Sequence, residues 1–166
     1  MKNIILLLIG LYFISCGGNS NKNAAELWND GQKYRTENKL KESVVSYKTL
    51  IEKYPSTNFA AKAQFQIADI YLNDVKDFDF AVKEFKTVVD LYPNHEVAKK
   101  SLFMIAYIFN NYLNAYSDAI ITYKLFRKKY PNDELIPSVE YELDGLKDIQ
   151  STIDSLNRTV NKKSNI

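Results

Sequence analysis

The 166-residue chain is poor in the residues that build reactive or cross-linked sites. It has one cysteine and one histidine, so it can form no internal disulfide and no zinc site of Cys and His ligands. Its five glycines form no phosphate-binding loop, and no nucleophile elbow or His-Glu-x-x-His sequence occurs. A net charge of +2 is too balanced to indicate a nucleic-acid partner. We therefore expect no enzyme, no metal and no cofactor.

Aromatic residues, by contrast, are plentiful, and three of them mark a repeat. The dipeptide Tyr-Pro occurs at Tyr54-Pro55, Tyr92-Pro93 and Tyr130-Pro131, at a constant interval of 38 residues. A fixed period in this range is typical of stacked helical repeats. Since proline cannot continue a helix, each Tyr-Pro is expected to end one.

Other positions follow the same period, and each keeps one class of side chain. Further upstream, the columns slip by one residue between the first and second copies, which we interpret as an extra residue in the turn of the second and third copies. Small residues allow helices to approach closely, and aromatic residues fill the space beside that contact. The columns are Gly31/Ala68/Ala106, Ser43/Ala81/Ala119, Tyr47/Phe85/Tyr123, Leu50/Val88/Phe126, Trp28/Phe65/Phe103 and Tyr34/Tyr71/Phe109.

Apolar spacing predicts three antiparallel helix pairs. The expected helices cover 24–38, 40–54, 59–73, 78–92, 96–113 and 116–130. Asp77 and Ser117 are expected helix starts. The fold class is all-α, a tetratricopeptide-like superhelical array of three helix pairs plus a C-terminal capping helix.

This pattern resembles the tetratricopeptide repeat over residues 24–131. The residues that carry the resemblance are Leu27, Gly31, Tyr34, Ser43, Tyr47, Leu50 and Pro55 with their counterparts in the next two copies. The resemblance implies that the first helix of each pair lines a curved inner surface that binds protein or peptide partners.

We expect the first 23 residues to form a leader and a tether. An apolar run follows Lys2 and ends at Ser15-Cys16, about half the length needed to span a bilayer. This resembles the lipobox of bacterial lipoproteins, which implies a signal peptide at 1–15, lipid attachment at Cys16 and a flexible tether at 16–23. Gly17 after the cysteine implies, by the same resemblance, an outer-membrane location facing the periplasm.

Long repeats that each end in Tyr-Pro resemble a subgroup of envelope proteins, the BamD family of outer-membrane assembly lipoproteins and the C-terminal repeat domain of the YbgF family. This resemblance implies a scaffold in outer-membrane protein assembly. The alternative is a Tol–Pal or cell-wall coordination module.

The C-terminal segment, residues 132–166, is expected to hold a final helix opened by Pro137. Its apolar seam is narrow and heptad-like. One interpretation is a cap on the last repeat, and the other is pairing with a second chain through residues 139–160. The seam residues are Val139, Leu143, Leu146, Ile149, Ile153, Leu156 and Val160.

The inward positions of the repeat family give the candidate partner-binding residues. Amide and aromatic side chains on such a surface can hold an extended or helical peptide. The alternative is that the aromatic members only pack the helices together. The candidates are Trp28, Gln32 and Arg35 from the first pair, Phe65, Gln66, Asp69 and Asn73 from the second, and Phe103, Tyr107 and Asn111 from the third.

Overall fold

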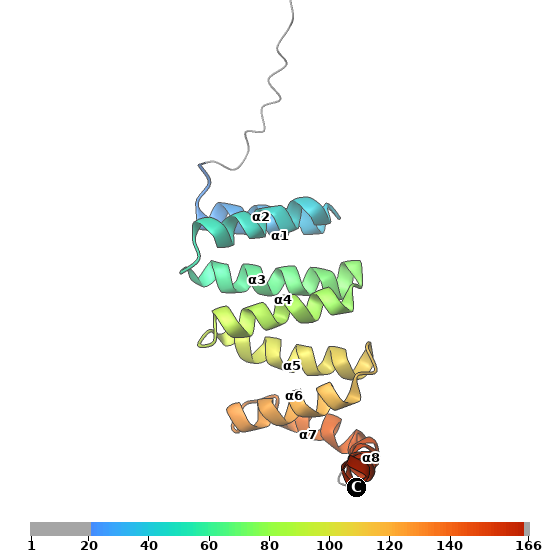
Figure 1. Cartoon of the computed structure of the whole chain (residues 1–166). Coiled ribbons are helices and arrows are strands. Elements are labelled where there is room, and N and C mark those ends of the chain that lie inside the picture. The colour runs from blue at the N-terminus through green and yellow to red at the C-terminus, as the bar shows by residue number, and fades with distance from the viewer. Residues whose placement is uncertain (1–20, 165–166) are drawn as a thin grey trace, which may run out of the picture.

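The computed structural model describes residues 21–164, so the leader and the lipid-attachment prediction at Cys16 lie outside the described residues. The described chain is helical throughout its regular structure, as expected (Figure 1). The elements are α1 (Ala24–Thr36), α2 (Leu40–Lys53), α3 (Asn58–Ile70), the π-helical turn η1 (Tyr71–Val75), α4 (Phe78–Leu91), α5 (Glu96–Asn111), α6 (Tyr116–Lys129), α7 (Ile136–Gly145) and α8 (Lys147–Ser164).

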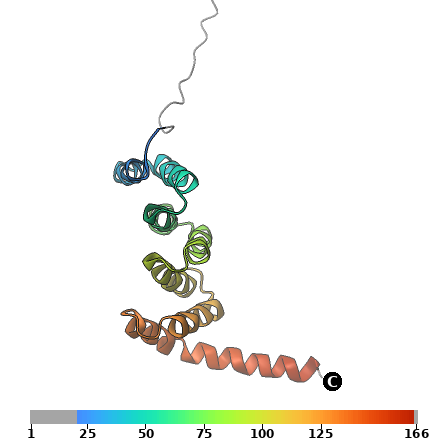
Figure 2. The same ribbon diagram turned by 90° about the vertical axis from the view of Figure 1, so that its left-hand side faces the viewer.

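The helices stack in chain order into two layers. Figure 2 shows the odd-numbered helices α1, α3, α5 and α7 in one column and the even-numbered helices α2, α4 and α6 in the other. Direct packing of α3 against both α1 and α5 brings the odd-numbered helices together. The odd-numbered layer is therefore the surface that the repeat pattern assigns to partner binding. Among residues 21–164, no helix is long and apolar enough to cross a membrane.

The repeat columns form the core. Every member of the two small columns and of the Tyr47 and Leu50 columns is buried. Three apolar clusters follow one another along the stack. Each repeat thus buries its faces against the next, as expected of a stacked array.

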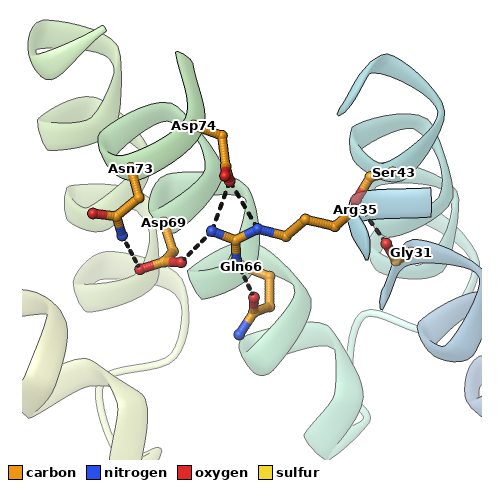
Figure 3. A network of polar contacts seen from close by, with 7 residues as sticks. All are labelled: Gly31, Arg35, Ser43, Gln66, Asp69, Asn73 and Asp74. Carbon is orange, nitrogen blue, oxygen red and sulfur yellow. Dashed lines mark hydrogen bonds and ion pairs between the residues drawn. The ribbon is translucent and has the colours of Figure 1, made fainter. Parts of the chain in front are cut away.

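The first repeat shows why a small residue is required. The ring of Tyr47 lies against Gly31 so closely that a Cβ there would lie 2.4 Å from the ring carbon Cε1. The Ser43 hydroxyl donates a 2.7 Å hydrogen bond to the Gly31 carbonyl oxygen (Figure 3). Glycine and serine together let α1 and α2 touch at the backbone.

The same backbone hydrogen bond closes the turn inside every repeat. The residue just before the second helix donates its N–H to a carbonyl oxygen near the end of the first helix. The residue directly before each donor has a positive φ angle, and these residues are Asn38, Lys76 and Asn114. The donor–acceptor pairs are Lys39–Tyr34, Asp77–Tyr71 and Ala115–Phe109, at 2.8, 2.9 and 2.8 Å.

The extra residue lies at the end of the first helix in the second repeat and in the predicted turn in the third. In the second repeat it widens the last helical turn into η1, where the N–H of Lys76 donates to the carbonyl of Tyr71. In the third, the N–H of Leu113 donates across an equally wide turn to Ile108, at 3.1 Å. The prediction of an extra turn residue is therefore wrong for the second copy, where the helix end absorbs it. It is correct for the third copy, where residues 112–115 separate α5 from α6 and only residues 37–39 separate α1 from α2.

The predicted helix start at Asp77 is correct, since its side chain accepts a hydrogen bond from the N–H of Phe80. The start at Ser117 is wrong, because α6 is preceded by Ala115 as its N-cap. The expected single C-terminal helix is two helices. A break at Leu146 lets α7 lie against α6, whereas α8 leaves the stack (Figure 2).

Candidate functional site

Four of the predicted partner-binding residues meet in one polar network between α1, α3 and η1 (Figure 3). Arg35 is at its centre. Its Nε donates to Asp74 Oδ2 at 2.8 Å, and its Nη1 donates to Gln66 Oε1 at 2.9 Å. Its Nη2 lies 2.7 Å from both Asp69 Oδ2 and Asp74 Oδ2. The amide of Asn73 donates to the second Asp69 oxygen at 2.8 Å.

This network gives every nitrogen of the Arg35 guanidinium a partner. The Arg35 side chain is 23% exposed, and burial by itself lowers its pKa. The bonds to Asp69 and Asp74 outweigh that effect, so the pKa of Arg35 is raised and the guanidinium stays charged. A fully paired guanidinium holds the first two repeats together and leaves little for a partner to bind.

Three of the four predicted aromatic residues pack against the second helix of their own repeat. Ring centroids of Trp28 and Tyr47 lie 5.5 Å apart, those of Phe65 and Phe85 5.2 Å, and those of Phe103 and Tyr123 5.8 Å. Phe65 is buried, and Trp28 and Phe103 are half-buried. Each ring therefore braces the first helix of a pair against the second.

A hollow of about 610 Å³ opens on the odd-numbered layer between α5 and the start of α7. Its apolar side chains include Phe103, while Lys and Glu residues provide its polar ones. The lining residues are Glu96, Val97, Lys99, Lys100, Phe103, Met104, Glu134 and Leu135. We call this cavity the α5–α7 hollow.

Aromatic rings continue from the α5–α7 hollow along α5. Phe103 and Tyr107 lie nearly parallel with centroids 6.4 Å apart, and Tyr107 meets Tyr112 edge-on at 6.0 Å. Tyr112, which is 44% exposed, stacks on Phe78 of α4 at 4.4 Å. An apolar strip thus leads from the hollow toward the turn that precedes α4.

Two further candidates, Gln32 and Asn111, form no hydrogen bond to another helix, and the histidine has a structural role. Gln32 is exposed, and Asn111 donates only to the Tyr107 carbonyl one turn before it. His95 caps α5, since its Nδ1 accepts from the Val97 N–H at 3.1 Å and its Nε2 contacts Asn58 Oδ1. Within residues 21–164, no cluster of three or more His, Cys, Asp or Glu side chains has the arrangement of a metal site.

A family model described as "Soluble NSF attachment protein, SNAP" matches residues 14–138 of this chain. The chain belongs to the soluble NSF attachment protein family. The match covers α1 to α6 and the first residues of α7. The family match and the stacked helices both indicate a tetratricopeptide-like helical array. It supports the repeat fold and not the BamD or YbgF families in particular. No curated protein matches the chain.

The residues of the α5–α7 hollow other than Phe103 were missed by the sequence prediction, although signals for them exist. Lys100, Lys99 and Glu96 precede Phe103 by three, four and seven residues, so they follow from extending the same helical face backwards. Leu135 lies 38 residues after Val97, and Glu134 lies 38 after Glu96. The repeat period therefore pairs the two sides of the hollow.

Proposed function

We propose that this SNAP-family chain is a non-enzymatic scaffold that binds a protein partner at the α5–α7 hollow and the ring strip beside it. The observation that carries the proposal is the contrast within the odd-numbered layer. At its α1–α3 end the polar groups are bound to each other, and at its α5–α7 end an apolar cavity with charged residues around it is open. A helix or extended segment with an apolar anchor fits such a cavity.

We also propose that lipid on Cys16 holds this scaffold at the bacterial outer membrane, facing the periplasm. The leader pattern supports this setting, and two or more acyl chains anchor a protein stably. Outer-membrane protein assembly is the process we favour. The family description names attachment to another protein, NSF, which agrees with an adaptor role.

Partner binding at the hollow is tested by substituting residues at the hollow and its ring strip and, as controls, residues elsewhere on the surface. Tyr107→Ala and Lys100→Glu are expected to weaken capture of the partner about tenfold, because they remove a ring contact and reverse a charge at the hollow. Tyr141→Ala and Lys128→Glu are the matched controls, since both residues are exposed and neither lines the hollow. Equal capture by all four folded variants would refute the site.

The setting is tested by crosslinking in whole envelopes and identifying captured proteins by mass spectrometry. Recovery of β-barrel assembly components supports the favoured process, and recovery of Tol–Pal or wall-synthesis proteins replaces it with the alternative. Mass spectrometry of the N-terminal peptide tests the anchor independently. An unmodified Cys16 thiol in membrane-derived protein would end the lipoprotein proposal without affecting the hollow.

A further inference from the structure

Helix α7 occupies the position of a first helix in a further repeat. In the turn before it, the N–H of Asp133 donates to the Tyr130 carbonyl at 3.2 Å and the N–H of Ile136 donates to the Asp133 carbonyl at 3.0 Å. The same two hydrogen bonds occur at the start of α5 and of α3, one and two repeat periods earlier in the chain. The junction between α5 and α7 is thus the counterpart of the junction between α1 and α3.

These two junctions have hydrogen-bonding side chains at the same positions. Arg35 of α1 donates to Gln66 of α3 at 2.9 Å. Asn110 occupies the position of Arg35 in the third repeat, and Glu142 lies two periods of 38 residues after Gln66. Asn110 donates to Glu142 at 2.7 Å. The last junction therefore has an amide where the first has a guanidinium, and a carboxylate where the first has an amide.

The Glu142 carboxylate is half-buried and has no cation beside it within residues 21–164. Its Oε2 accepts the bond from Asn110, and no other donor contacts it in that range. The neighbouring carboxylate of Asp144 is already paired with Lys147. Burial raises the pKa of the Tyr123 hydroxyl, and the charge of Glu142 raises it further, which places that charge beside the core of the third repeat. Glu142 thus retains the capacity to accept a charged donor.

A cavity of about 400 Å³ opens at Glu142 and shares no lining residue with the α5–α7 hollow. We call it the Glu142 pocket. The rings of Tyr116 and Tyr141 line it, and Tyr141 is 80% exposed. Gly145, two periods after Asp69, leaves space there, since a Cβ would meet nothing within 4 Å. No lysine or arginine is among the described residues that line the pocket. A carboxylate beside tyrosine rings is complementary to a planar, weakly hydrated guanidinium.

We propose that the Glu142 pocket binds an arginine side chain of the partner protein. The guanidinium donates to the Glu142 carboxylate, much as Arg35 donates to its acceptors in the first junction (Figure 3), and its plane lies against the ring of Tyr141. Lysine fits less well, because its ammonium is more strongly hydrated and does not stack on a ring. That the arginine belongs to a partner rests on the proposed function, whereas the affinity of the pocket for a guanidinium does not.

The position of the Glu142 pocket sets the spacing of the residues that the partner must present. Phe103 of the α5–α7 hollow and Asn110 of the pocket are seven residues apart on α5, which is about 10 Å along the helix. A partner with an apolar anchor in the hollow therefore carries its arginine about two helical turns, or about three extended residues, from that anchor.

The first test supplies the guanidinium from within the chain. Asn110→Arg places an arginine at the position of Arg35, opposite Glu142, and should raise the midpoint of thermal unfolding by about 3 °C. The gain should vanish when the same substitution is made in a Glu142→Ala background. Asn111→Arg, at the exposed neighbouring position, is the control and should give no gain. If Asn110→Arg gives the same change with and without Glu142, the pocket does not hold a guanidinium.

The second test titrates N-acetyl-arginine amide into the full chain in mild detergent, followed by NMR. Millimolar probe should shift the side-chain amide signal of Asn110 and the backbone signal of Gly145, and Glu142→Gln should weaken binding about tenfold. Glu140→Gln is the matched control, because Glu140 is an exposed carboxylate of the same helix that does not line the pocket. N-acetyl-citrulline amide, which has nearly the same shape without the charge, should cause no shift.

Equal shifts with the citrulline or lysine derivative, or unchanged arginine binding in Glu142→Gln, would overturn the assignment to a guanidinium. Undiminished capture of the partner by Glu142→Gln would show that the partner places no arginine there. The titration contains no partner, so failure of the capture test at the α5–α7 hollow would refute the proposed function without changing its result.

Discussion

The two ends of the odd-numbered layer use equivalent positions in opposite ways. Near α1, Arg35 occupies a position whose counterparts in the next two repeats are Leu72 and Asn110. Arg35 is bound by two carboxylates of the second repeat, Leu72 is buried, and Asn110 donates to Glu142 of α7 at 2.7 Å. The same backbone position thus closes one junction with charge, a second with apolar packing and a third with one hydrogen bond.

The lesson is that the repeat determines where a side chain lies, while its neighbours determine whether it is available. A polar residue on the inner surface is a binding residue only when the adjacent repeat does not already satisfy it. Three sets of substitutions test this contrast, each with a matched control substitution elsewhere in the stack.

We call the α1–α3 end closed, because its polar groups bind each other, and the α5–α7 end open. The largest loss of stability is expected for Gly31→Ala at the closed end. The new methyl group would lie 2.4 Å from a buried ring carbon of Tyr47, so ring and helix must separate. Overpacking of this kind should lower the free energy of unfolding by about 3 kcal/mol, measured by urea denaturation. Gly145→Ala is the control, because its Cβ meets nothing within 4 Å. Similar losses for both would show that close helix contact at Gly31 is not what the glycine provides.

The next effect separates a paired arginine from an exposed one. Arg35→Ala leaves Asp69 and Asp74 close together without their cation, and should cost about 2 kcal/mol of unfolding free energy. Arg127→Ala removes a pair with Glu140 in which both side chains are about half exposed, and should cost less than about 0.5 kcal/mol. Equal costs in the two denaturation experiments would abolish the distinction between a closed and an open end.

The smallest effect at neutral pH concerns Tyr47 and Tyr123, whose buried hydroxyls have no hydrogen-bond partner among the described residues. Burial raises the pKa of Tyr47 to about 12 and that of Tyr123 further. A raised pKa means that the unfolded chain releases the hydroxyl proton at a lower pH than the folded chain. The free energy of unfolding is therefore unaffected by these groups below pH 10 and falls as the pH rises toward 12.

Phenylalanine at either position should therefore change the unfolding free energy at pH 7 by less than about 1 kcal/mol and flatten this alkaline decline. Thermal unfolding followed between pH 8 and pH 11.5 measures it, with the Tyr141→Phe variant, exposed at 80%, as control. A decline of unchanged steepness in Tyr47→Phe/Tyr123→Phe would show that these hydroxyls do not couple to folding.

The fold was largely predictable, because close helix packing restricts side-chain size at every period. The positions of Gly31, Ser43 and Tyr47 in the repeat predict a close contact between two helices, and the structure has that contact. The position of the extra residue in η1 could not be predicted, since a widened helical turn and a longer loop have the same length in sequence. The break at Leu146 was hidden for a similar reason, because the heptad-like spacing continues through it.

The candidate site was harder to predict than the fold. The sequence identified Arg35, Asp69 and Asn73 as inward-facing, but their spacing contains no information about whether they bind one another. Salt bridges between repeats depend on the angle between helices, which the period does not specify. Lys100 and Leu135 were missed because the inward positions taken from the repeat family begin at Phe103 in α5, one turn after Lys100.

The widened turn η1 has a consequence for how such arrays change in length. Because the backbone hydrogen bond from Asp77 to Tyr71 is kept while the helix end expands, an inserted amino acid need not alter the tilt or spacing of the next pair. Length variation can then accumulate at one helix terminus per repeat while the pitch of the superhelix stays constant. Alignments of related arrays that place the gap between the last turn of the first helix and the start of the second helix will keep equivalent core residues together.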